Sequence, residues 1–177
     1  MRSTTMPLAA IGTYATVASL VFAVTAAETI FLYPNMFRDI PESLALSEEF
    51  MTVVDIGAVM RPMGGVMTLC AMIAIVVALW ARQARGWITA SLVFLVGSQF
   101  LSILYQWPRA SIFGERDEHT LQEVEKAATE FLVGHGFRIA ASLATAVLAI
   151  AAVFSIYRAR VLAEARASSS GEHALVS

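Results

Sequence analysis

The stretch EFLVGHGFRIAASLATAVLAI, residues 130–150, decides the fold. After its opening glutamate the only ionisable side chains are those of His135 and Arg138, and the other residues are apolar, small or uncharged. A run of this length matches the ~20 residues that a helix needs to cross the hydrocarbon core of a bilayer. The stretch therefore predicts a membrane-spanning helix whose first turns contain a histidine and an arginine.

Three further segments have the same character. Of the 177 residues, 58% are hydrophobic and 15% are charged, whereas soluble domains have about 45–50% and about 25%. The excess lies in four blocks, residues 7–32, 56–80, 87–107 and 134–157. We predict an all-α polytopic membrane protein, an antiparallel four-helix transmembrane bundle formed by the single domain 1–165. The small, polar segment 166–177 predicts a disordered cytoplasmic tail.

The charges of the connecting segments predict the orientation. The hairpin ARQARG holds Arg82 and Arg85 and no acid, and two more arginines follow the fourth span. The positive-inside rule therefore places the hairpin and both termini in the cytoplasm, with the chain in the cell (cytoplasmic) membrane. The connections 33–55 and 108–134 are rich in aspartate and glutamate and face outward in this orientation.

Both outward connections are expected to form helical extracytoplasmic extensions. Thr120 and Glu123 have the spacing of a capping box, and the periodic pattern behind them predicts one helix from about residue 120 past Tyr157. In the other connection, Ser47 is expected to cap an amphipathic stretch that runs into the second span.

A small set of polar side chains lies in the outer halves of the spans. A charged group at the centre of a membrane helix costs about 2.5–3.5 kcal/mol by insertion measurements, so such groups normally face the bundle interior. On the fourth span four of them form one helical stripe: His135, Arg138, Ser142 and Thr145. The other spans contribute Glu28, Arg61, Gln99, Ser102, Tyr105 and Gln106. We expect them to meet in one electropositive pocket, which would suit an anionic or enolate-like oxygen.

Simpler interpretations exist for each of these residues. Glu28 with Arg61 or Arg138 is also the pattern of a structural ion pair that fixes helix register. His135 alone fits a hydrogen-bonded histidine at a helix interface, and Arg61 beside a proline fits an arginine whose long side chain reaches the headgroups.

The sequence offers few ligands for a metal. Zinc and copper sites need several imidazoles or thiolates, and His119, the other outward histidine, lies on nearly the opposite helical face from His135. Cys70 is the one cysteine, so no internal disulfide forms. We predict no metal site and no cofactor, and leave open whether a metal or another redox cofactor assists.

Three features resemble the four-span membrane family of unknown-function proteins that includes fungal anthrone oxygenases. One is a first span that ends near a proline, in IFLYPNMF, followed by an outer helix. Another is the pair of outer segments with a tight basic hairpin between the middle spans. The last is an aromatic residue, a histidine and an arginine at the head of the final span, here Phe131, His135 and Arg138 in FLVGHGFRIAAS. The resemblance covers about residues 11–157.

The chain departs from the family pattern at two places. Phe131 stands where tryptophan is usual, and QWPRASIFG contains Pro108 but not the asparagine that members often show after the third span.

The resemblance implies oxygenation of an activated aromatic methylene, as in the conversion of an anthrone to an anthraquinone. On this hypothesis His135 is the base, Arg138 and Arg61 stabilise the anion, and Glu28 orients one of the arginines. The lipophilic substrate would enter from the lipid and contact Tyr105, Gln106, Gln99 and Ser142.

Two other function classes remain as alternatives. A proton-coupled or small-molecule transporter, formed by a homodimer of four-span chains, would need polar groups through both leaflets, and the inner halves of the spans lack ionisable side chains. An accessory or scaffold subunit would use the acidic outer segments to dock a basic partner. Nucleic-acid binding has no support, because the basic residues are few and scattered.

Overall fold

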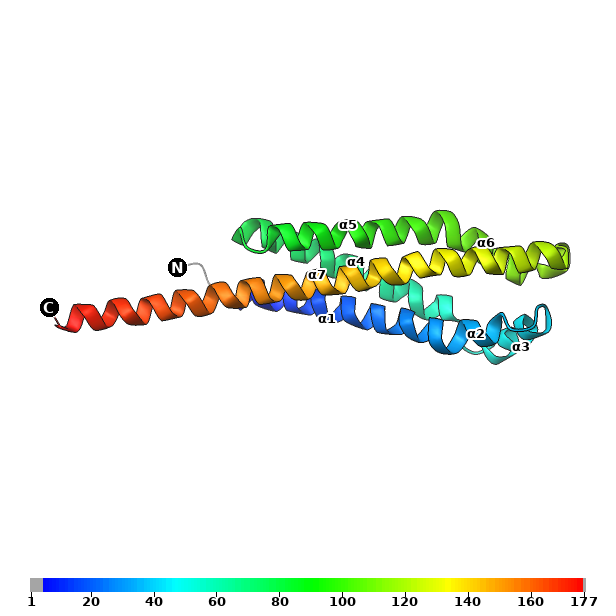
Figure 1. Ribbon diagram of the computed structural model, residues 1–177, viewed down its shortest axis with the longest axis horizontal. Helices are drawn as coiled ribbons and strands as arrows, with labels where there is room; N and C mark the ends of the chain where they lie inside the picture. Colours follow the sequence, from blue (N-terminus) through cyan, green and yellow to red (C-terminus); the bar gives the residue numbers. More distant parts are fainter. Residues whose placement is uncertain (1–4, 177) are drawn as a thin grey trace.

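The computed structural model describes the backbone of residues 5–176 and the side chains of residues 5–168 (Figure 1). Within this range all regular elements are helices, which confirms the predicted all-α fold class. Their order is α1 (Thr5–Ala27), η1 (Glu28–Leu32), α2 (Tyr33–Met36), α3 (Glu42–Phe50), α4 (Ile56–Ala81), α5 (Arg85–Leu101), η2 (Ser102–Gln106), α6 (Trp107–Gly114), η3 (Arg116–Glu118) and α7 (Leu121–Val176).

Four helical stretches are long and apolar enough to cross a membrane, as predicted: Thr5–Met36, Ile56–Ala81, Arg85–Gly114 and Leu121–Ser168. They run antiparallel, so that the start of α1, the end of α7 and the hairpin between α4 and α5 lie at one end of the bundle (Figure 1). The short helices α2, α3 and α6 lie at the other end, where they form the two predicted helical extensions.

The helix α7 makes the largest contacts of the bundle, since it packs against both α1 and α5, while α4 packs mainly against α1. Buried small side chains line these contacts and let membrane helices approach closely. They include Ala15, Ala18, Ala71, Ala74, Ala78, Ala146, Ala149 and Ala152.

A chain of hydroxyl groups joins α1, α5 and α7 in the half of the bundle nearer the α4–α5 hairpin. The Tyr14 hydroxyl lies 2.7 Å from Ser91 Oγ, and Ser91 donates to the backbone carbonyl of Thr145 at 2.8 Å. Because the Ser91 hydrogen is used on that carbonyl, Tyr14 must donate to Ser91. All three side chains are buried, so these bonds fix the register of three helices.

At the other end a second apolar cluster joins the extensions to α7. Its buried members, which we call the aromatic cap, are Tyr33, Leu44, Phe113, Val124, Ala127, Ala128 and Phe131. Two ion pairs support it: Arg116 lies 2.7 Å from Glu48 on α3, and Arg109 on α6 lies 2.8 Å from Glu130 on α7. The aromatic cap covers the end of the bundle opposite the α4–α5 hairpin.

The starts of two helices test the predicted caps. Thr120 and Glu123 form the expected capping box, in which the Thr120 N–H donates to the Glu123 carboxylate at 2.8 Å. The prediction for Ser47 is wrong, because Ser47 lies inside α3 and the chain leaves the helix after Phe50. The cap of α4 is Asp55, whose carboxylate accepts the Ala58 N–H at 2.8 Å.

The backbone of residues 166–176 continues the helix α7. Good helix formers in VLAEARA and an Arg160–Glu164 ion pair of 2.8 Å, one turn apart, favour helix here. The side chains of residues 161–168 are all exposed, so no described packing supports this part of the helix. Disorder of the tail and the single domain 1–165 stay predictions.

Candidate functional site

Two π-helical segments interrupt the first and third spans beside the head of the fourth. In η1 the Tyr33 N–H bonds to the carbonyl of Glu28, and in η2 the Trp107 N–H bonds to that of Ser102, each five residues back. A proline follows in the first turn of the next helix in both cases. Proline has no N–H, and its ring clashes with the carbonyl four residues back. The wider π turn accommodates both effects.

The π segments bring a carboxylate and an amide to Arg138 on α7. Arg138 Nη2 donates to Glu28 Oε2 at 2.9 Å, and Nη1 donates to Gln106 Oε1 at 3.2 Å. The Glu28 side chain is 7% exposed and the Arg138 side chain is 16% exposed. The Tyr33 hydroxyl lies 3.5 Å from the same Glu28 oxygen. One arginine is thus neutralised by one carboxylate at the junction of three spans.

His135 lies one helical turn before Arg138 and is 1% exposed. Its Nε2 is 2.8 Å from the Thr29 hydroxyl. The Tyr33 ring meets the imidazole edge-on with centroids 4.6 Å apart, and the Phe131 ring stacks parallel to it at 6.2 Å. The imidazole therefore sits beside the aromatic cap, held by its hydrogen bond with Thr29 and by contacts with two rings.

The hydrogen bonds of Thr29 indicate which nitrogen of His135 carries the proton. The Thr29 hydroxyl donates to the Thr25 carbonyl at 2.9 Å, so its single hydrogen is used and its oxygen accepts from His135 Nε2–H. The opposite tautomer would bury an N–H at Nδ1 with no acceptor, and orphaned buried N–H groups are rare. His135 therefore presents an unprotonated Nδ1.

Three buried polar atoms of this network have no hydrogen-bond partner within the described chain: Glu28 Oε1, Gln106 Nε2 and His135 Nδ1. Buried polar atoms are nearly always paired, so each exception needs an explanation. Here two acceptors and one donor, on three different spans, surround a single arginine. This polar cluster of Glu28, Thr29, Gln106, His135 and Arg138 is the candidate site.

The remaining residues expected at the site lie around the cluster or away from it. Tyr105 packs on the α7 backbone, where a Cβ added to Gly134 would lie 2.7 Å from its ring, and the Arg109 guanidinium lies over the ring, 3.5 Å from its centroid. Ser142 is buried but donates to the Ile139 carbonyl of its own helix. Gln99 faces α4 at Gly64.

Arg61 does not join the cluster. It is exposed on α4, and its Nε donates to the Gly57 carbonyl one turn back at 3.0 Å. The expected pocket with an excess of positive charge is therefore not formed. In the polar cluster the charge of Arg138 is balanced by that of Glu28.

Thr29 and Tyr33 were not expected at the site. Glu28 and Tyr33 are five residues apart, which in an α-helix places two side chains about 140° apart around the axis, at about 100° per residue. The π turn brings both toward α7. The available signal was Pro34, which disrupts regular α-helical hydrogen bonding in the residues before it.

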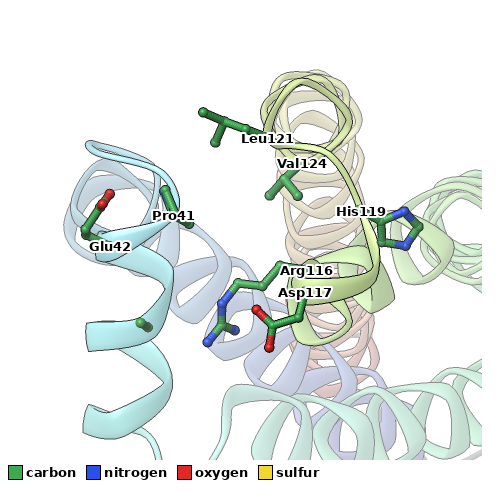
Figure 2. Close-up of a pocket in the computed structure, with 8 residues that line it drawn as sticks. Pro41, Glu42, Arg116, Asp117, His119, Leu121 and Val124 are labelled. Carbon is green, nitrogen blue, oxygen red and sulfur yellow. The ribbon is translucent and has the colours of Figure 1, made fainter.

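Two hollows of about 400 and 510 Å³ lie among the extensions. The smaller is between α3 and the η3–α7 turn, where Arg116 and Asp117 project toward α3 while the imidazole of His119 points away from it (Figure 2). Neither hollow is lined by a residue of the polar cluster. Arg138 and Tyr105 are partly exposed, so the cluster approaches the surface of the bundle at these two side chains.

No group of three or more His, Cys, Asp or Glu side chains that could hold a metal occurs in the described part of the chain. Comparisons with known protein families, with curated proteins and with solved structures found no match in any of the three. The interpretation of the site therefore depends on its own geometry.

Proposed function

We propose that the protein is a membrane oxidoreductase that acts on a lipophilic, aromatic carbon acid, in the manner of an anthrone oxygenase. The observation that supports this most is the buried Nδ1 of His135, which has no hydrogen-bond partner among the described residues and lies one helical turn from Arg138. A base and a cation in a buried site can remove a proton from a carbon acid and stabilise the enolate that forms.

The proposed reaction needs only dioxygen as co-reactant. His135 Nδ1 takes a proton from the activated methylene, and the resulting enolate reduces dioxygen to form a carbon–oxygen bond and a peroxide anion. The protonated His135 returns its proton to this anion, which gives a hydroperoxide and restores the base. The hydroperoxide then loses water, because the remaining C–H gives up its proton and the O–O bond breaks, leaving a ketone. In sum, one methylene and one O₂ give one carbonyl and one water.

The other members of the cluster would support the anion. The free Nε2–H of Gln106 can donate to the enolate oxygen, and the Arg138 guanidinium adds positive charge at short range. Glu28 holds Arg138 in place, so it is a positioning residue, as is Thr29 toward His135. The aromatic cap excludes water from the outer side, which strengthens each of these interactions.

Purified protein in bilayers tests the proposal by oxygen uptake and ketone formation with anthrone as the probe. We expect turnover by the wild type, a loss of at least about 100-fold in His135→Gln, in line with the usual size of general-base effects, and near-normal turnover in Arg61→Gln. Equal rates in wild type and His135→Gln would exclude His135 as the base. No turnover by a folded wild type would contradict the proposed reaction.

A purely structural role is the competing account of the Glu28–Arg138 pair. It is favoured by the absence of cluster residues from both hollows. On that account Glu28→Gln and His135→Gln would lower the unfolding temperature together, whereas the proposal expects His135→Gln to abolish turnover with little change in stability.

We further infer that both termini face the cytoplasm, in the cytoplasmic membrane. The arginines of the α4–α5 hairpin and of the end of α7 support this by the positive-inside rule. In a Cys70→Ala background, a membrane-impermeant maleimide should label Glu118→Cys but not Arg85→Cys in intact cells. Labelling of Arg85→Cys alone would reverse the orientation.

A further inference from the structure

A set of apolar side chains on and after α3 is exposed just before the second span begins. We call it the α3 face; it consists of Leu46 (67% exposed), Phe50 (85%), Val53 (92%) and Val54 (58%). The opposite side of α3 packs Leu44 into the aromatic cap. Contiguous apolar surface of this kind marks a contact site, because exposing it to water is unfavourable.

The α3 face is continuous with the lipid-facing surface of the first span. Phe31, in η1, is 71% exposed and lines the same hollow of about 510 Å³ as Leu46 and Phe50. Ile30, its neighbour on the span, is 64% exposed. Because α3 connects the ends of two candidate membrane spans, the exposed rings of Phe31 and Phe50 favour the bilayer over a second soluble protein as the partner of this surface.

The rim of this hollow contains charges of both signs. Arg38 is exposed and has no hydrogen bond or ion pair within the described residues. Asp39 and Glu42 line the same hollow, and Glu42 also borders the smaller hollow, where its side chain is not directed at Arg116 (Figure 2). A cationic and an anionic rim above an apolar wall match a headgroup that has a phosphate, an amine and acyl chains.

We propose that the hollow between α2 and α3 binds a zwitterionic, amine-bearing phospholipid, with the α3 face resting in the same leaflet. The guanidinium of Arg38 pairs with the lipid phosphate, since its planar fork suits phosphate oxygens. Asp39 and Glu42 pair with the ammonium group, and Phe31 and Phe50 contact the first part of the acyl chains. The two carboxylates disfavour a headgroup with net negative charge. This site is separate from the polar cluster and does not depend on its chemistry.

Spin labels test where the α3 face lies. In a Cys70→Ala background, labels at Phe50→Cys and Val53→Cys in vesicles of phosphatidylethanolamine and phosphatidylglycerol should be reached by oxygen and shielded from a water-soluble nickel chelate. A label at Glu118→Cys, in the exposed η3 turn, should show the reverse. Nickel access at Phe50 and Val53 equal to that at Glu118 would place the face in water and overturn the proposal.

Lipid binding tests the headgroup site. Detergent-purified protein is titrated separately with phosphatidylethanolamine and phosphatidylglycerol, and bound lipid is counted by native mass spectrometry. The wild type should retain phosphatidylethanolamine severalfold better, and Arg38→Gln and Glu42→Gln should each remove that preference, whereas Arg85→Gln at the opposite end should keep it. Circular dichroism checks that each variant is folded. Equal retention of the two lipids by the wild type, or a preference unchanged in both rim variants, would overturn the proposal.

Discussion

Arg138 on α7 and Glu28 on the first span form an ion pair of 2.9 Å between residues 110 positions apart in the sequence. The pair lies under the aromatic cap, and Gln106 of the third span occupies the other side of the guanidinium at 3.2 Å. Three of the four spans therefore depend on one arginine for their relative position, and the same arginine adjoins the candidate base.

Removing the carboxylate should destabilise the bundle. Glu28→Gln keeps the side-chain size but leaves Arg138 buried without a counter-charge, and breaking one partner of a buried pair costs about 3–5 kcal/mol. Thermal unfolding in detergent should show a clear drop. Glu48→Gln, which removes the more exposed partner of Arg116, is the control and should cost under about 1 kcal/mol. Similar losses in both variants would mean that the Glu28–Arg138 pair is not effectively buried.

Two neighbouring glycines should respond oppositely to alanine. At Gly134 a Cβ would lie 2.7 Å from the Tyr105 ring, whereas nothing lies within 4 Å at Gly136. Gly134→Ala should therefore cost about 1–3 kcal/mol through overpacking, while Gly136→Ala should be neutral or stabilise the helix by about 0.5–1 kcal/mol. In a Tyr105→Ala background the cost of Gly134→Ala should fall, which leaves the milder contact of 3.3 Å with Gln106 Nε2. An undiminished cost would place the clash elsewhere.

The hydroxyl chain between α1, α5 and α7 gives a smaller effect. Tyr14→Phe removes the donor to Ser91 but leaves the Ser91–Thr145 bond intact, and interhelical hydrogen bonds in membranes contribute about 0.6 kcal/mol on average. Thr16→Val is the control, because the Thr16 hydroxyl bonds only to Gly12 of its own helix. A larger loss of stability in Thr16→Val than in Tyr14→Phe would contradict the role of the Tyr14–Ser91 bond in fixing the register of α1, α5 and α7.

Thr29 should matter for turnover rather than for folding. Thr29→Val preserves the shape of the side chain but removes the acceptor of the His135 Nε2–H. The lost hydrogen bond contributes about 1–1.5 kcal/mol to the orientation of the imidazole, and a barrier higher by this amount corresponds to roughly a tenfold lower rate. Thr29→Ser restores the hydroxyl and should restore most of the rate of anthrone oxidation. A valine variant as active as wild type would remove Thr29 from the positioning role.

Much of the fold follows from the sequence because lipid is a uniform solvent. Apolar runs near 20 residues long predict spans with little ambiguity, and the cost of a charge in hydrocarbon predicts that His135 and Arg138 face inward. The same cost does not predict whether Arg61 faces the bundle interior. Near the start of α4 a long side chain can reach the membrane surface, and there its exposed guanidinium bonds to Gly57 of its own helix.

The contacts around His135 were not predictable from α-helical periodicity. Thr29 and Tyr33 reach α7 because the hydrogen bonds of η1 join residues five apart rather than four. This wider turn rotates the side chains that follow it to a different face of the helix. Pro34 and Pro108 indicate where such turns are needed, but proline also permits a kink or a helix end. The choice among these depends on packing against α7, which is a tertiary effect.

The central claim is that His135 offers a free Nδ1 to the proton of a substrate. The chain has three histidines, so a His119→Gln, His173→Gln background leaves His135 alone for ¹⁵N-histidine NMR in bilayers. At neutral pH we predict an Nε2-protonated, neutral ring whose Nδ1 resonance moves when anthrone is added without oxygen, and does not move in Arg138→Gln. A ring protonated at Nδ1, or an Nδ1 resonance whose position does not change when anthrone is added, would contradict the account.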